Sequence, residues 1–570
     1  MMVVPMLVVN AGSLSKDDEN FDKLTQDYLL EYFKASPITA TWIGIHEYDA
    51  MLDDISPMAR ERRLQLLTSY KKKYEALNGS MLSPARNVDY RIILENLDEE
   101  IFGIEELREY EWNPMAYTGA VGNAIMQLIT QEFAPLEQRL TNALARTKEV
   151  SKFLDQAKSN LQRSTKIHVQ TAILQNKGNV SIFKEELPKA AEKASPDLKK
   201  EIERESEKAV AVLEAFGTWL ETDLLPRASM NPRIGSELFK KKLQHNLKSN
   251  LSPEEILRRA EAEVQRVHRA MYTVAAPLHR EYFGEPGSDT LAVIKAVLGK
   301  IVLDHPSAAG LMDSIRAIIP EIEKFVIEKD LLTLDPSQPL VIRETPKYER
   351  GVSVASLESP GPLEKNLKSF YNVTPIPPDW SPEQVESFLR EYNNWSLRNL
   401  SIHEAIPGHY VQLYYSNRFP SVVRSVYGSG AMIEGWAVYT ERMMVEQGFQ
   451  NHDPRMKLIN LKWYIRVVIN AIIDQKIHAG TMTEQEAMDL MMKEGFQEER
   501  EAAGKWRRAN LTSTQLSTYF VGFQEIWDLR KDYEKKVGNR FNLKQFHEAF
   551  LSFGSPSVKY IRAIMMENER

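Results

Sequence analysis

Cysteine is missing from the sequence of 570 residues. Its absence excludes disulfide bonds, thiolate metal ligands and cysteine nucleophiles, and it leaves the redox compartment undetermined. Any transition metal must therefore be held by His, Asp or Glu side chains, and the chain contains 11 histidines.

The sequence also has no long apolar run and no block of basic residues. No stretch reaches the roughly 18 consecutive apolar residues of a membrane-spanning helix, so we predict no integral membrane span. The 72 basic and 79 acidic residues give a formal net charge of −7 and are spread along the chain. Because no basic patch is present to contact phosphate groups, we do not expect nucleic acid as a partner.

The N-terminus carries a short apolar run, Met1 to Val9, which ends in the small-residue pattern Val9-Asn10-Ala11. Such a pattern is typical of the sites that signal peptidases cleave. However, no Lys or Arg precedes the run, and the run is short for a signal peptide. We treat residues 1–20 as an N-terminal segment that resembles a signal-peptide remnant, and the sequence leaves export and a cytoplasmic location equally open.

Most of the remaining sequence shows apolar residues at steps of three and four, which is typical of amphipathic helices. The exception runs from about Leu331 to Pro378, where prolines recur between the short β-prone runs LVIRE, VSVAS and SFYNV. We therefore predict a mainly α protein with one small β-sheet. We place a boundary near residue 330, between a helical N-terminal lobe (residues 21–330) and a lobe that holds the sheet and further helices (residues 331–570).

The stretch HEAIPGH, residues 403–409, holds two histidines at an unusual spacing. In the zinc-binding pattern H-E-x-x-H the histidines are four residues apart and share one helix face. A step of six residues on a continuous helix rotates by about 600°, which leaves His409 roughly 120° away from His403. However, Pro407 cannot continue the helical hydrogen bonds, and Gly408 allows backbone angles that other residues resist. We therefore predict an interruption at the Pro-Gly pair that returns the second histidine to the side of the first.

A second stretch, GSGAMIEGWAVYTER at residues 428–442, supplies a carboxylate. Glu434 follows His409 by 25 residues, which suffices for a turn and the start of another helix. Two histidines and one carboxylate are a common ligand set of catalytic zinc, so Glu434 is the candidate third ligand, and Gly435 beside it permits close helix packing. The alternatives are two buried histidines on a kinked helix, a Glu434 placed by the helix dipole, and a solvated helix face for Glu441.

The pair HEAIPGH and EGWAVY resembles the signature HExxPGH followed by EGWA, which marks bacterial zinc-metallopeptidase-like proteins long catalogued as a domain of unknown function. The segments ITATWIGIHEYDAMLDD and LSTYFVGFQEIWDLR also look like this family, so the resemblance covers nearly the whole chain. The family is similar to the gluzincin peptidases, which implies a large two-lobed helical fold with a small sheet beside the active-site cleft. The resemblance also implies one Zn²⁺ per chain, held by His403, His409 and Glu434, with Glu404 as the general base.

The function that this resemblance implies is that of a zinc-dependent metallopeptidase acting on a peptide substrate. Zinc would lower the pKa of a bound water, and Glu404 would accept its proton during attack on the peptide carbonyl. The developing oxyanion needs a hydrogen-bond donor. Tyr519, in a segment that matches the family's Y-x-x-G, is our catalytic candidate for this donor, and a plain core tyrosine is the alternative.

Three further residues are candidates for substrate binding. In gluzincin-like enzymes an edge strand ahead of the zinc helix pairs with the extended substrate, and the run Phe370 to Val373, which includes Tyr371, is our candidate. Arg466 and His478 belong to a polar stripe on an otherwise apolar helix. Such a stripe lines the cleft, supports the metal ligands or forms a buried structural network.

Two other functions stay open on the sequence alone. The protein could be a catalytically inactive metal- or peptide-binding protein on the same fold, although Glu404 beside the predicted ligands favours catalysis. It could also hydrolyse a non-peptide amide or ester with the same residues. The sequence does not specify the position of cleavage, the physiological substrate or the oligomeric state.

Overall fold

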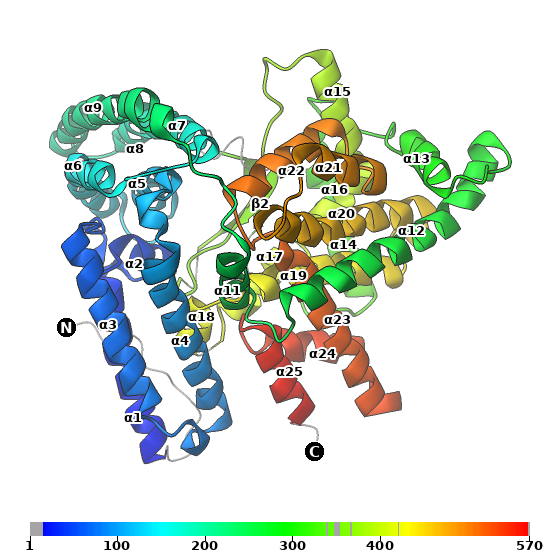
Figure 1. Cartoon of the computed structure of the whole chain (residues 1–570), viewed down its shortest axis with the longest axis horizontal. Helices are drawn as coiled ribbons and strands as arrows, with labels where there is room; N and C mark the ends of the chain where they lie inside the picture. Colours follow the sequence, from blue (N-terminus) through cyan, green and yellow to red (C-terminus); the bar gives the residue numbers. More distant parts are fainter. Residues whose placement is uncertain (1–14, 338–339, 347–353, 365–366, 420, 568–570) are drawn as a thin grey trace.

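The computed structural model describes residues 15–337, 340–346, 354–364, 367–419 and 421–567 (Figure 1). Helices dominate these residues, which also include one three-stranded sheet. The predicted mainly α fold with a small sheet is therefore confirmed. Within the described ranges, no helix has the length and apolar character that crossing a membrane requires. The apolar run at the N-terminus lies outside the described residues.

The N-terminal helices form two hydrophobic cores, coloured from blue to green at the left of Figure 1. The first core is built by α1 (Lys16–Lys34), α2 (Pro37–Ile43), α3 (Pro57–Glu75) and α4 (Pro84–Phe102), and α18 (Val422–Val426) adds Val423 to it. The second core is built by α5 (Pro114–Thr130), α6 (Leu136–Asn160), α7 (Lys166–Ser181), α8 (Leu187–Ala191) and α9 (Pro196–Trp219).

The third and largest core holds the elements that carry the predicted site. Its long helix α12 (Pro253–Phe283) is amphipathic and buries its apolar side, from Ile256 to Leu278, in this core. Three helices before the sheet also surround this core: α11 (Ser236–Leu247), α13 (Thr290–Ile301) and α14 (Leu311–Glu328). The helices after the sheet that surround it are α15 (Pro382–Glu391), α16 (Asn394–Glu404), α17 (His409–Ser416), α19 (Gly430–Glu446) and α20 (Pro454–His478). They are followed by α21 (Glu484–Asp489), α22 (Glu499–Leu511), α23 (Ser517–Val537), α24 (Leu543–Leu551) and α25 (Val558–Glu567).

The cores divide the chain at a different place from the predicted lobe boundary. Helices α11 to α14 share the third core with the site, whereas a boundary at residue 330 assigns them to the N-terminal lobe. The last buried residue of the second core is Ala228, and the first of the third core is Phe239. Packing alone does not define folding units, so the two-lobe division stays a prediction.

The small sheet consists of β1 (Leu340–Glu344), β2 (Ala355–Glu358) and β3 (Ser369–Val373). The runs LVIRE and SFYNV are the strands β1 and β3, while VSVAS overlaps β2 in its last two residues. Strand β3 lies in the centre, parallel to β1 and antiparallel to β2. The predicted edge position of Phe370 to Val373 is therefore wrong, because both edges of β3 are already paired.

Two glycines allow α19 and α23 to cross at backbone distance. A Cβ atom added to Gly435 would lie 2.3 Å from the carbonyl carbon of Gly522, and one added to Gly522 would lie 1.7 Å from the carbonyl oxygen of Ala431. Neither position accepts a side chain unless the helices separate. The close approach that Gly435 permits is thus with α23, and it fixes two site-bearing helices against each other.

Candidate metal centre

The two predicted histidines lie on either side of a break between helices. Helix α16 ends at Glu404, and α17 begins at His409, so the predicted interruption is present. The backbone N–H of Gly408 donates to the carbonyl of Ile402 over 3.0 Å. A Cβ at position 408 would lie 1.9 Å from the carbonyl oxygen of His403, so glycine alone fits this turn.

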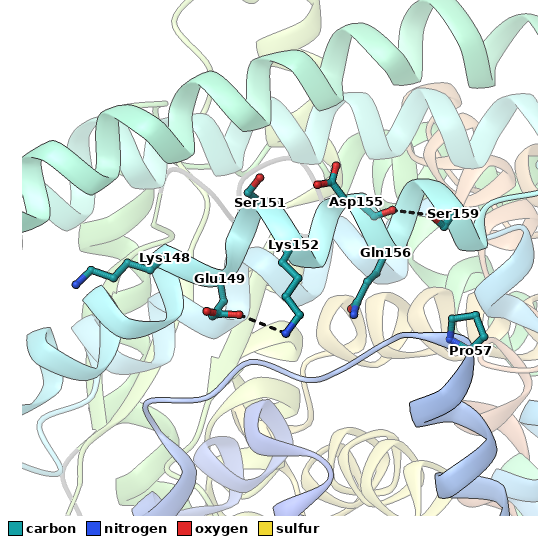
Figure 2. Close-up of a pocket in the computed structure, with 8 residues that line it drawn as sticks. All are labelled: Pro57, Lys148, Glu149, Ser151, Lys152, Asp155, Gln156 and Ser159. Atoms are coloured by element: carbon teal, nitrogen blue, oxygen red, sulfur yellow. Dashed lines mark hydrogen bonds and ion pairs between the residues drawn. The ribbon is translucent and has the colours of Figure 1, made fainter.

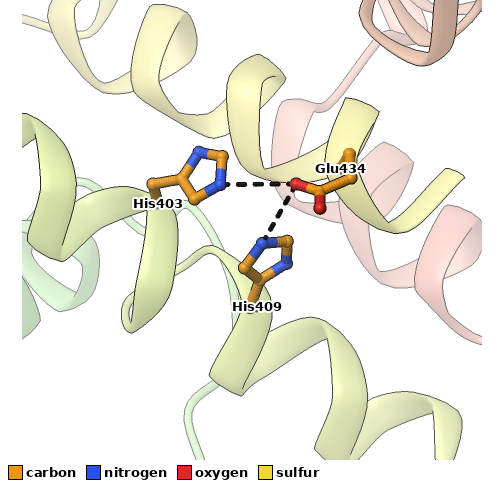
Figure 3. Close-up of side chains that lie close together, drawn as sticks. All are labelled: His403, His409 and Glu434. Atoms are coloured by element: carbon orange, nitrogen blue, oxygen red, sulfur yellow. Dashed lines mark ion pairs between the residues drawn. The ribbon is translucent and has the colours of Figure 1, made fainter. Parts of the chain in front are cut away.

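The break brings both imidazoles to one carboxylate (Figure 3). The Nε2 atom of His403 lies 3.5 Å, and that of His409 3.4 Å, from the same oxygen, Oε2 of Glu434 on α19. The two rings meet edge to face, with centroids 4.7 Å apart. The three side chains have ligand atoms within 4.8 Å of one another, and no other such group of three occurs among the described residues.

These separations fit a metal ion better than they fit hydrogen bonds. Charge-assisted N–H···O bonds are typically about 2.7–2.9 Å long. Two ligand atoms at about 2.0–2.1 Å from a tetrahedral zinc ion are about 3.3 Å apart, which is close to both observed distances. Oε2 of Glu434 and Nδ1 of His409 are also buried without a hydrogen-bond partner among the described residues. The donor set is therefore suited to zinc.

A second carboxylate on α19 orients His403. Oε1 of Glu441 accepts a hydrogen bond from Nδ1 of His403 over 2.7 Å, which directs Nε2 toward Glu434. Its other oxygen accepts from Asn399 over 2.6 Å, and Asn460 donates to Asn399 over 2.9 Å. Carboxylates behind metal-bound histidines fix the tautomer and the ring orientation in this way.

Sequence reasoning missed the role of Glu441. Its side chain is buried, with the residue only 2% exposed, so the solvated helix face considered as an alternative is wrong. A signal was available, because Glu441 follows Glu434 by seven residues, or about two helical turns, and therefore shares its face. The same spacing rule that identifies metal ligands on a helix would have placed both carboxylates at one site.

The cluster is strongly coupled electrostatically. Burial lowers the pKa of His403, but the nearby carboxylates of Glu434 and Glu441 outweigh this effect and raise that pKa well above its usual range. Burial raises the pKa of Glu434, but the two histidines hold it well below its usual range. The carboxylate of Glu434 is therefore charged and ready to bind a cation.

Glu404, the predicted general base, is the last residue of α16 and follows the predicted ligand His403. Burial raises the pKa of its carboxyl group, and the charge of Glu434 adds to this rise against the opposing histidines. Its carboxylate accepts a hydrogen bond from the backbone N–H of Leu357 in β2. A carboxylate with a raised pKa that is held by one fixed hydrogen bond is suited to taking up a proton near neutral pH.

Tyr519, the predicted oxyanion donor, lies at the same centre. Its ring stacks on that of His403 with centroids 6.4 Å apart. The hydroxyl accepts hydrogen bonds from Arg508 over 3.2 Å and from Gln515 over 3.4 Å, which leaves its proton available for donation. Burial, with the charge of Glu434, raises the pKa of this phenol to about 12, so it stays neutral at physiological pH.

The structure does not bring the three predicted substrate-binding residues into a substrate-facing position. Tyr371 is fully buried, and its hydroxyl lies 3.3 Å from Oγ of Ser401 beneath α16. Arg466 forms an ion pair with Glu501. His478 contacts the backbone carbonyl of Ala509 over 2.7 Å at the end of α22. These contacts match the alternative interpretation of the stripe as a buried structural network.

His46, in the segment ITATWIGIHEYDAMLDD, joins two distant parts of the chain. Its imidazole lies 3.0 Å from Asp49, pairs with Glu364 and stacks on Phe133 with centroids 3.7 Å apart. Burial lowers its pKa, but the hydrogen bonds with Asp49 and Glu364 outweigh this and raise it to about 9. The charged imidazole therefore ties the chain between β2 and β3 to the N-terminal helices.

Two surface hollows of the described residues lie elsewhere on the protein. One lies along the polar side of α6 next to Pro57, with charges of both signs and an ion pair between Glu149 and Lys152 (Figure 2). A second lies between α12, α23 and α25 and is lined by mixed charges. Neither includes a residue of the predicted metal site.

Comparison with known proteins agrees with the motif-based assignment at the level of the family. The family described as "Bacterial protein of unknown function (DUF885)" matches residues 37–565, so the chain belongs to this family. No curated protein matches the chain.

Two solved structures share the fold. One is described as "a putative lipoprotein of unknown function" from Shewanella oneidensis, with 37% identity, a TM-score of 0.81, and coverage of 96% of this chain and 100% of that chain. The other is a "putative lipoprotein" from Colwellia psychrerythraea, with a TM-score of 0.80 and coverage of 98% and 100%. At 17% identity, the second shows the fold alone.

Proposed function

We propose that this protein is a zinc-dependent metallopeptidase. One observation carries the proposal: both imidazole Nε2 atoms lie 3.4–3.5 Å from one buried oxygen of Glu434. This is the spacing of ligands that share a tetrahedral zinc ion, and a general-base carboxylate stands beside them on the chain. The ligands would be His403, His409 and Glu434.

The roles of the protein's own residues follow from their contacts. Zinc, when bound, lowers the pKa of a water molecule and polarises a carbonyl group. Glu404 takes a proton from the attacking water and later passes it to the leaving amine. The hydroxyl group of Tyr519 donates a hydrogen bond to the oxygen on which negative charge develops. Glu441 keeps the imidazole of His403 oriented.

The edge of the sheet that can meet a substrate belongs to β2 rather than β3. Among the described residues strand β2 pairs only with β3, along one edge, and the N–H of Leu357 donates to Glu404. The free edge of β2 therefore faces the proposed catalytic carboxylate. An extended peptide that pairs with this edge would bring its backbone carbonyls to the site, whatever its side chains.

The proposal is tested by metal content and by cleavage of unselected peptides. We expect about one zinc per chain by elemental mass spectrometry after dialysis against metal-free buffer, because the ligand set is that of catalytic zinc sites. We also expect mass spectrometry to detect new peptide termini when the zinc-loaded protein is incubated with a tryptic digest. Zinc binding without any cleavage would favour a metal-binding protein without activity, and absence of zinc after reconstitution would refute the metal centre.

Replacing Glu441 with glutamine is expected to weaken zinc binding about 10- to 100-fold, because the amide no longer accepts a charged hydrogen bond from His403. Competition with a chelating fluorophore would measure the zinc dissociation constant. The same substitution at Glu446, at the end of the same helix, is the control and should leave it unchanged. Equal zinc affinities of the Glu441→Gln variant and the wild type would show that Glu441 has a packing role only.

A further inference from the structure

One side of α22 presents three charged residues at helical spacing, Glu501, Lys505 and Arg508, and this helix packs against α20. The carboxylates in this layer are already paired. Glu391 binds Lys462 over 2.8 Å, and Glu501 pairs with Arg466.

Two cations of the layer are left without a carboxylate. Lys505 is 7% exposed, and among the described residues it has neither an ion-pair partner nor a hydrogen-bond acceptor. Arg508 donates to the neutral oxygens of Gln515 and Tyr519, over 3.0 Å and 3.2 Å. A positive charge on a mostly buried lysine without a carboxylate partner is costly, so an anion that the folded chain does not supply would stabilise it.

These two cations lie on the side of the metal centre formed by α22 and α23. Arg508 contacts the hydroxyl of Tyr519, whose ring stacks on His403. The carboxylate of Glu434 lies within electrostatic reach of both Lys505 and Arg508. An anionic group bound between the two cations would therefore be attached to a molecule that extends over the proposed metal site.

We propose that Lys505 and Arg508 bind a carboxylate group of the peptide substrate next to the scissile bond. This inference rests on the proposed peptidase function and names its substrate class. The guanidinium of Arg508 suits a planar carboxylate, and the ammonium of Lys505 adds a compact positive charge. The carboxylate belongs to the C-terminus of the peptide or to an acidic side chain, and the two sources are separable by experiment.

The energetics of Lys505 support a binding role. Burial, together with the charge of Arg466, lowers its pKa to about 7. Because the folded-state pKa lies below the unfolded-state value, this lysine destabilises the fold fully below pH 7 and progressively less as the pH rises toward 10. The Lys505→Met variant should therefore have a higher Tm than the parent protein, with the larger gain at pH 6 than at pH 9. If Lys505 served only in packing, the Lys505→Met variant would have a lower Tm than the parent protein.

The experiment uses the full-length Glu404→Gln protein loaded with zinc, so that bound peptides are not cleaved. The immobilised protein is incubated with equimolar N-acetylated hexapeptides of random sequence that end in a free carboxylate or in a carboxamide, and mass spectrometry compares the two bound fractions. We expect about tenfold enrichment of the free acids if the C-terminal carboxylate is the ligand. Enrichment of carboxamides that contain Asp or Glu would identify an acidic side chain instead.

Further substitutions in this protein test the two cations directly. Lys505→Met and Arg508→Gln should each reduce the ratio of bound free acids to bound carboxamides toward one, and neither should change the zinc content. Arg507→Gln is the matched control, because Arg507 is the neighbouring residue and bonds to Thr171 instead. If both peptide pools bind equally and neither substitution changes this, the inference about Lys505 and Arg508 is wrong. The peptidase proposal is unaffected by that result. No binding of either pool, together with no cleavage by the zinc-loaded wild type, would overturn both.

Discussion

The Glu404→Gln variant is expected to bind one zinc ion and to lose peptidase activity by about 10²- to 10⁴-fold in kcat. The substitution keeps the shape of the side chain and an oxygen that accepts the hydrogen bond from Leu357. It removes the proton acceptor, because an amide does not take up a proton near neutral pH. The effect should therefore fall on kcat, while zinc affinity and peptide affinity change little.

This experiment needs a control for the substitution itself. Glu383 lies exposed at the start of α15, so Glu383→Gln makes the same chemical change away from the site. Its activity should equal that of the wild type. A Glu404→Gln variant with wild-type turnover of the same peptide would eliminate Glu404 as the general base, even if the protein proved to be a zinc peptidase.

The second large effect is expected from removal of a ligand. The His409→Ala variant should retain almost no zinc after dialysis, since two protein ligands bind this ion far more weakly than three. The loss should exceed the 10- to 100-fold that is typical of substitutions behind the ligands. Elemental mass spectrometry gives the zinc content, and circular dichroism shows whether the helices persist.

His409 is the preferred ligand for this test because its removal disturbs little else. Its Nδ1 atom has no hydrogen-bond partner among the described residues, whereas that of His403 is bonded to Glu441. The exposed histidine His452 provides the control variant His452→Ala. Full zinc content in His409→Ala would mean that other residues bind the ion. The assignments of both His409 and Glu434 as ligands would then be wrong.

The helix break at the centre was predictable because its cause is local. Pro407 and Gly408 act on the backbone of their own turn, so the return of His409 toward His403 follows from the sequence. The position of Glu434 beside the two histidines was predictable from the ligand set that zinc prefers and from its distance along the chain, while its role as a ligand stays a prediction. The strands β1 and β3 were predictable from their β-prone runs.

Other features depend on contacts between distant parts of the chain. Which strand lies in the centre of a sheet is a matter of pairing order, which the composition of SFYNV does not determine. The sequence pattern of the stripe that includes Arg466 and His478 does not show whether these side chains contact a substrate or other buried residues. The unpaired state of Lys505 becomes visible only when every neighbouring carboxylate has been assigned to another cation.

The close crossing of α19 and α23 at Gly435 and Gly522 determines which parts of this protein can be mutated without disturbing the predicted metal site. Gly435 follows Glu434 directly, and Gly522 lies about one turn after Tyr519, so backbone contact determines the distance between the proposed ligand Glu434 and the phenol of Tyr519. A directed-evolution search for new specificity could vary α22 and the free edge of β2 while this distance stays constant. A side chain at either glycine would separate the two helices and change this distance, so such a library should exclude both positions.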